Sequence, residues 1–94
     1  MKVRISSRAR SQLAVICEYL VDRDAASAAA RLGIAIRAAL ELLSHFPRFG
    51  HDGTAPGTFE WTVRGTPYII VYELHLGTID ELMVLGVFHG AQDR

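Results

Sequence analysis

Four histidines and one cysteine are the residues of this chain whose side chains are the commonest ligands of transition metals. His45, His51, His75 and His89 are scattered, and no two of them stand at the helical spacing that presents paired zinc ligands on one face. The single cysteine, Cys17, can form no disulfide within the chain, and it lies at helical spacing among apolar residues, as a buried thiol does. The pattern therefore predicts no metal site, and no cofactor is expected.

Nucleophiles and general acids are equally sparse. No GxSxG turn surrounds Ser6 or Ser7, so these serines are interpreted as helix caps. Asp80 and Glu81 are adjacent in a predicted strand, which directs them to opposite faces and prevents them from forming a carboxylate pair. His89 ends that strand and could act as an acid or base, although a histidine at a strand end is more often merely solvated. The chain also has no glycine-rich phosphate loop, HExxH or CxxC motif.

Charge and length limit the class of partner. Ten basic residues balance ten acidic ones and the formal net charge is zero, which argues against strong binding to a nucleic-acid backbone. No apolar run approaches the roughly 20 residues that span a membrane. Arg4, Arg8 and Arg10 interrupt any secretory signal. We therefore expect a single domain over residues 1–94 that binds no membrane and resides in the cytoplasm.

The first half of the chain has helical periodicity. Residues 2–5 alternate polar and apolar side chains, which predicts a short strand. A first helix follows from Ser7 to about Asp22, and Asp24 is the expected cap of a second helix over 25–46. The apolar residues of the second helix recur at intervals of four, four and three: Leu32, Ile36, Leu40 and Leu43.

The second half changes to a period of two. Pro47 ends the second helix, and the glycines and prolines of residues 47–58 predict a loop. Strands are predicted over 59–64, 68–74 and 79–89, and their short connections indicate an antiparallel meander. The predicted fold class is α+β, in the order β-α-α-β-β-β, with a helical hairpin on one face of an antiparallel sheet.

The last two strands are apolar on both faces, although helices can cover only one face of the sheet. Two interpretations stay open: the 47–58 loop seals the second face, or a helix or strand of a partner covers it. Simple alternation places five apolar residues together on that second face: Ile69, Val71, Leu82, Val84 and Phe88.

Four segments in order resemble the RelE/ParE toxin superfamily along nearly the whole chain. They are ISSRARSQL at 5–13 with Ile16 and Tyr19, Leu43 with Pro47 and Gly50, PYIIVY at 67–72, and VFHGAQD at 87–93. The last segment is similar to the ending common in ParE, the branch of plasmid-stabilisation toxins. The resemblance implies the RelE/ParE-like fold and a toxin of a bacterial type II toxin–antitoxin system.

The two branches differ in activity. RelE-like toxins cut messenger RNA on the ribosome with basic residues on the open sheet face, whereas ParE-like toxins inhibit DNA gyrase. By alignment, those basic positions fall on Glu60, Thr62, Ile69 and about Gly90, and the late tyrosine that follows is absent. The resemblance therefore implies a gyrase inhibitor that is not an enzyme. The alternatives are a ribosome-dependent ribonuclease that uses His89 with Arg64, and an inactive relative that only binds its antitoxin.

The same resemblance implies two protein partners. A ParD-like antitoxin with a disordered tail is expected on the second sheet face, over the five apolar residues given above. Gyrase is expected at the end of the sheet, where polar groups stand near aromatic ones. The candidate target-binding residues are Trp61, Arg64, His89, Asp93 and Arg94. Solvated strand ends remain the alternative for this set.

Overall fold

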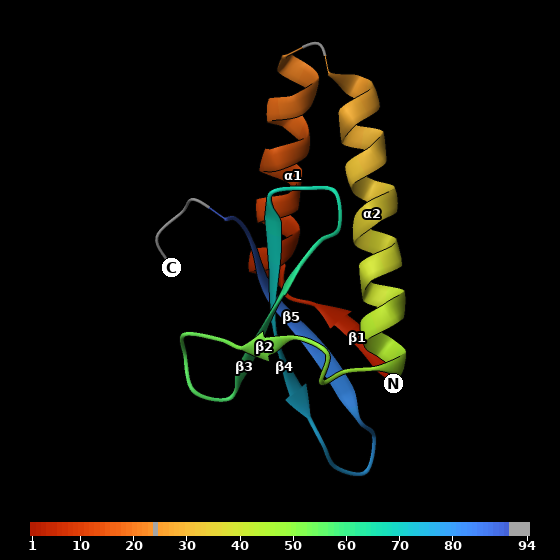
Figure 1. Cartoon of the computed structure of the whole chain (residues 1–94), viewed down its shortest axis with the longest axis vertical. Coiled ribbons are helices and arrows are strands. Elements are labelled where there is room, and N and C mark those ends of the chain that lie inside the picture. The colour runs from red at the N-terminus through yellow and green to blue at the C-terminus, as the bar shows by residue number, and fades with distance from the viewer. Residues whose placement is uncertain (24, 91–94) are drawn as a thin grey trace.

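The computed structural model describes residues 1–23 and 25–90. Two helices stand side by side as a hairpin and extend beyond one end of a sheet, in a body of 44 × 25 × 23 Å (Figure 1). The elements in chain order are β1 (Lys2–Ile5), α1 (Ser7–Asp22), α2 (Ala26–His45), β2 (His51–Asp52), β3 (Thr58–Thr62), β4 (Tyr68–His75) and β5 (Glu81–His89). Neither helix in the described ranges is both long and apolar enough to cross a membrane.

The five strands form one sheet in the order β1-β5-β4-β3-β2. The pairs β2–β3, β3–β4 and β4–β5 are antiparallel, which confirms the predicted meander, and β1 joins the same sheet as expected. Because β1 runs parallel to β5, the sheet is mixed rather than antiparallel throughout. The two-residue strand β2 lies inside the region predicted to be a loop.

Helix α1 begins where β1 ends, and residues of its first turns hydrogen-bond to the part of β5 that follows the β1 pairing. The Ser6 hydroxyl caps α1 by accepting from the Ala9 amide at 3.1 Å, and it donates to the Leu85 carbonyl at 3.2 Å. Six residues later, Gln12 Oε1 accepts from the Val87 amide at 2.8 Å. Backbone groups of β5 that an edge would leave unpaired are therefore satisfied by α1 side chains.

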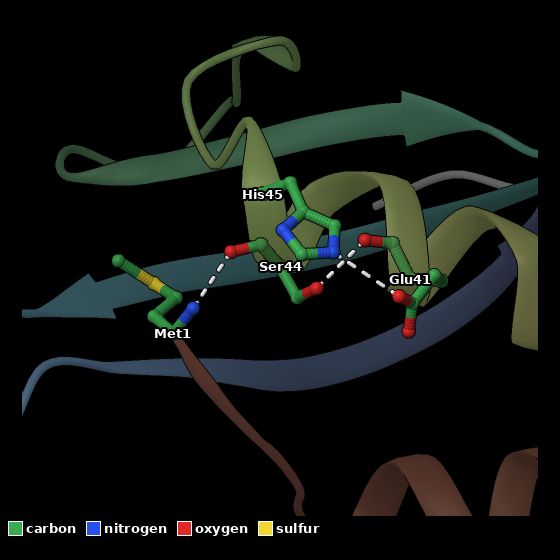
Figure 2. A network of polar contacts seen from close by, with 4 residues as sticks. All are labelled: Met1, Glu41, Ser44 and His45. Atoms are coloured by element: carbon green, nitrogen blue, oxygen red, sulfur yellow. Dashed lines mark hydrogen bonds and ion pairs between the residues drawn. The ribbon is translucent and has the colours of Figure 1, made fainter.

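Helix α2 supplies the helical side of the core. Its buried residues lie at the spacing of one helix face: Leu32, Ile36, Ala39 and Leu43. Ala25 occupies the N-cap position without a side-chain hydrogen bond, and the predicted cap Asp24 lies outside the described residues. At the other end, the Met1 amino group donates to the Ser44 carbonyl at 2.8 Å, next to an ion pair between His45 and Glu41 (Figure 2).

Because of a β-bulge, the residues on each face of the sheet differ from the prediction. The register moves from Val71↔Gly86 to Tyr72↔Val84, so Leu85 is an extra residue and the alternation of β5 inverts there. Leu82 and Val84 consequently face the helices, with exposed fractions of 0% and 2%. The prediction that all five apolar residues share the second face is wrong. The other three, Ile69, Val71 and Phe88, are partly exposed, and they lie on the opposite side from Leu82 and Val84.

Tyr72 fastens the segment after α2 to the core. Its ring is fully buried, and its hydroxyl donates to the Pro47 carbonyl at 2.6 Å and accepts from the Gly50 amide at 3.1 Å. A Cβ on Gly50 would stand 2.6 Å from that hydroxyl, so the site requires glycine. Burial raises the pKa of Tyr72, and the hydrogen bond from Gly50 partly offsets the shift.

Candidate functional site

Two adjoining hollows run between α2 and the β3–β4 hairpin and form one groove. Its first part has a volume of about 600 Å³ and its second part about 410 Å³, and both parts are lined by Ala35 and Arg64. We call this hollow the α2 groove. The first part adds Ala38, Ala39, Leu42, Phe49 and Trp61, and the second adds Leu20, Ala28, Arg31, Leu32, Gly65, Thr66, Pro67 and Tyr68.

Small side chains of α2 make the floor of this groove. Ala35, Ala38, Ala39 and Leu42 recur at the three- and four-residue spacing of one helix face. Three alanines in this stripe leave space that longer side chains would fill. The sequence pattern did not show that these small residues border an open groove.

Stacked aromatic rings form one wall. Phe46 stacks on Phe49 with ring centroids 4.7 Å apart, and Phe49 stacks on Trp61 at 6.3 Å. Phe46 and Phe49 are about half exposed, at 50% and 54%. The two phenylalanines flank Pro47, whose carbonyl is held by Tyr72, so the core fixes the position of the stack. Neither phenylalanine was predicted as a site residue from the sequence, although two aromatic residues beside a polar loop were a signal for an exposed apolar surface.

The β3–β4 turn carries Arg64, which lines both parts of the groove. Thr66 Oγ1 donates to the Val63 carbonyl at 2.9 Å and accepts from the Tyr68 amide at 3.1 Å. Gly65 has a φ of +77°, a left-handed conformation that favours glycine. This rigid turn leaves the Arg64 side chain exposed at the point that both parts of the groove share.

The remaining candidates for target binding are dispersed. His89 packs edge-on against Tyr68 at 5.6 Å between ring centroids, and the adjacent Gly90 amide donates to the Pro67 carbonyl at 2.7 Å. His89 thus lies beside the far end of the α2 groove, since Pro67 and Tyr68 line that end. Trp61 and Arg64 share its first part, whereas Asp93 and Arg94 lie outside the described residues.

The second face of the sheet is partly closed by the chain itself. Thr58 and Glu60 of β3 are buried on that face, at 8% and 4% exposure. The Thr54 amide donates to Glu60 Oε2 at 3.3 Å, and His51 Nε2 stands 3.6 Å from Glu60 Oε1. A shallow hollow of about 430 Å³ remains, lined by Arg8, Thr54, Ala55, Thr58, Val71, Leu85 and Phe88. The guanidinium of Arg8 lies 5.5 Å from the centroid of the Phe88 ring.

Three positions that align with basic residues of the nuclease branch lie together on this face. Glu60 pairs with Val71 and Thr62 pairs with Ile69, so Glu60, Thr62 and Ile69 point to the same side. The structure thus brings together a buried carboxylate, a hydroxyl and an aliphatic side chain. Within residues 1–23 and 25–90 no three His, Cys, Asp or Glu residues form a group that could hold a metal ion.

Two solved structures have the same fold. The structure titled "Chromosomal ParDE TA system from P. aeruginosa" aligns with a TM-score of 0.79 at 18% identity, covering 95% of each chain. The "YoeB/ParE toxin from Agrobacterium tumefaciens" aligns with a TM-score of 0.64 at 17% identity, covering 95% of this chain and 98% of the other. A search of curated proteins finds no match.

The sequence itself matches a family description over almost its full length. The model of the ParE toxin of the type II toxin–antitoxin system parDE matches residues 3–94. That match agrees with the two helices on a mixed sheet and with both structural relatives. This chain therefore belongs to the ParE toxin family.

Proposed function

We propose that this chain is the toxin of a type II toxin–antitoxin pair, that it inhibits DNA gyrase by binding, and that a ParD-like antitoxin neutralises it. The observation that carries the choice of a binding toxin over a ribonuclease is the second sheet face. Glu60 and Ile69 occupy positions there at which the nuclease branch places cations. Family membership supports the toxin role, and the proposal of gyrase follows from the ParE branch.

The lack of cations at these strand positions argues against RNA cleavage for an electrostatic reason. Cleavage of a phosphodiester needs cationic groups fixed where negative charge develops in the transition state. A carboxylate such as Glu60 would repel that charge. Arg8 is a cation near this face, but it belongs to α1 and lies over the ring of Phe88. It does not occupy any of the strand positions at which the nuclease branch places cations. The face is therefore unsuited to holding an RNA phosphate for cleavage.

The α2 groove is the proposed docking surface of the antitoxin. This replaces the sheet face, because Leu82 and Val84 are buried in the core. An alanine stripe suits the close approach of an amphipathic helix, and half-exposed aromatic rings are common interface anchors. Arg31 and Arg64 line the groove, so an acidic side chain of the antitoxin helix has a cation to meet. A partner that orders on binding can cover such a long surface.

The target is tested with purified components. The full chain, freed from its antitoxin, is titrated into a gyrase supercoiling assay beside a ribosome-programmed translation assay. We expect supercoiling to stop while ribosome-bound messenger RNA stays intact. Discrete cleavage of the message that disappears in His89→Ala would instead establish the ribonuclease alternative. A folded chain that affects neither assay yet binds its antitoxin would establish the inactive relative.

The docking surface is tested with a matched pair of substitutions on α2. Ala38→Trp fills the first part of the groove, whereas Ala30→Trp adds the same side chain at an exposed position that lines neither part. We expect Ala38→Trp to weaken antitoxin binding at least tenfold, about 1.4 kcal/mol, and Ala30→Trp to leave it unchanged. Full binding by a folded Ala38→Trp variant would place the antitoxin elsewhere.

A further inference from the structure

Strand β1 leaves one edge of the sheet open. It is the outermost strand, and the Ser6 amide donates to the Val84 carbonyl at 3.0 Å, so the even-numbered residues of this segment bond to β5. The backbone groups of Val3 and Ile5 consequently point outward. Arg10 Nε donates to the Ile5 carbonyl at 3.3 Å. Within the described part of the chain, the outward amides of Val3 and Ile5 have no further hydrogen-bond acceptor.

A second groove adjoins this open edge. It has a volume of about 460 Å³ and lies between β1 and α2. We call it the β1 groove, and its lining residues are Met1, Val3, Ile5, Gly33, Ile36, Arg37, Leu40, Glu41 and Ser44. Val3 and Ile5 enter it on the same sheet face as Leu82 and Val84, with which they pair. A strand added outside β1 would therefore direct alternate side chains into an apolar space.

Gly33 keeps this groove open. Glycine is unfavourable inside a helix compared with alanine. A Cβ built on Gly33 would meet no atom within 4 Å, so no close contact in the fold requires the glycine. The absence of a side chain at Gly33 of α2 enlarges a groove that lies beside the unpaired backbone groups of β1. The open groove and the open strand edge thus come from two different elements.

Charge determines which strand would fit. On the other face of β1, Lys2 and Arg4 are exposed, and Arg4 lies 3.6 Å from Glu81. Arg37 adds a cation to the lining of the groove, while Glu41 is engaged with His45 at 3.1 Å (Figure 2). An added strand thus needs apolar side chains toward α2 and acidic side chains, alternating with them, toward Lys2 and Arg4.

A second copy of this chain does not meet that requirement. Two β1 strands that paired antiparallel about a twofold axis would place Lys2 and Arg4 of both copies on the same face. Like charges directly opposite each other destabilise a strand pair. Basic residues on an edge strand commonly prevent such self-association.

We propose that β1 and the β1 groove bind an extended acidic segment of a partner protein, which pairs with β1 as an additional strand of the sheet. The segment alternates apolar and acidic residues. Main-chain hydrogen bonds to Val3 and Ile5 contribute affinity, and the groove selects the side chains. This inference is independent of the gyrase target and of the α2 groove, since it uses the opposite side of α2.

The test uses the full-length chain and a labelled peptide of about ten residues, the usual upper length of a strand, in which valine and glutamate alternate. Binding is followed by fluorescence anisotropy, and hydrogen exchange is followed by NMR. We expect saturable binding that slows exchange at the Val3 and Ile5 amides. A peptide in which lysine replaces glutamate should bind about tenfold more weakly or not at all.

Two variants separate binding from folding. Gly33→Leu should keep or raise Tm, because leucine favours helix, yet weaken the peptide about tenfold by filling the groove. Ala30→Leu, at an exposed position outside both grooves, should bind as the parent does. Equal binding of the lysine peptide, undiminished binding to Gly33→Leu, or dimerisation through β1 in sedimentation would each overturn the proposal.

Discussion

Replacing Tyr72 with phenylalanine tests whether the core holds the aromatic wall of the α2 groove. The change keeps the buried ring but removes the hydroxyl that links the Pro47 carbonyl and the Gly50 amide. An unsatisfied buried polar group costs about 1–3 kcal/mol. At about 4–8 °C per kcal/mol for a domain of this size, we expect Tm to fall by roughly 5–20 °C.

The assay combines urea unfolding with fluorescence of Trp61, the single tryptophan of the chain. Phe49 stacks on Trp61, so loosening of the segment after α2 should shift the emission of the folded protein before unfolding begins. Tyr19→Phe is the matched control, because Tyr19 is 52% exposed on α1. A loss smaller than about 0.5 kcal/mol in Tyr72→Phe at an unchanged m value, with unaltered Trp61 emission, would refute the reasoning.

Three further outcomes are expected. Gly86→Ala should lower stability by about 1–3 kcal/mol in urea unfolding, because the new Cβ would stand 2.6 Å from the Phe88 ring and 2.9 Å from Gln12 Oε1. Val84→Asp should unfold the chain, as seen by circular dichroism, rather than selectively weaken a partner, because it buries a charge in the core. The contribution of Tyr72 to stability should stay constant up to about pH 10 and then fall as pH rises toward its raised pKa, because the unfolded hydroxyl loses its proton first. Tyr72→Phe should remove this contribution from pH-dependent unfolding curves.

Periodicity predicted the helices well, because both have one continuous apolar face. The bounds of α1 agree with the prediction, and α2 begins and ends within a residue of it. The two-residue strand β2 is too short to show any period, so it was missed. The parallel pairing of β1 with β5 depends on contacts between distant segments, which local patterns do not report.

The five apolar residues assigned to the second sheet face were harder to predict, because the faces of β5 depend on a local irregularity. A single extra residue, Leu85, inverts the faces of β5, and nothing in a run of apolar residues marks where the alternation changes. Trp61 and Arg64 were chosen from the sequence and do share a groove. Phe46 and Phe49 were missed, because their stacking lies beside a segment that Tyr72 holds through a hydrogen bond to a residue 25 positions earlier, and local patterns do not report such a contact.

The position of β5 has a consequence for synthesis of the chain. Among the strands of the described residues this one is made last, yet it lies between β1 and β4 and pairs with both. A nascent chain can form the helical hairpin from local contacts, but Lys2 has no strand partner until Glu81 has left the ribosome. Pairing of β1 within the sheet therefore waits until β5 has been made.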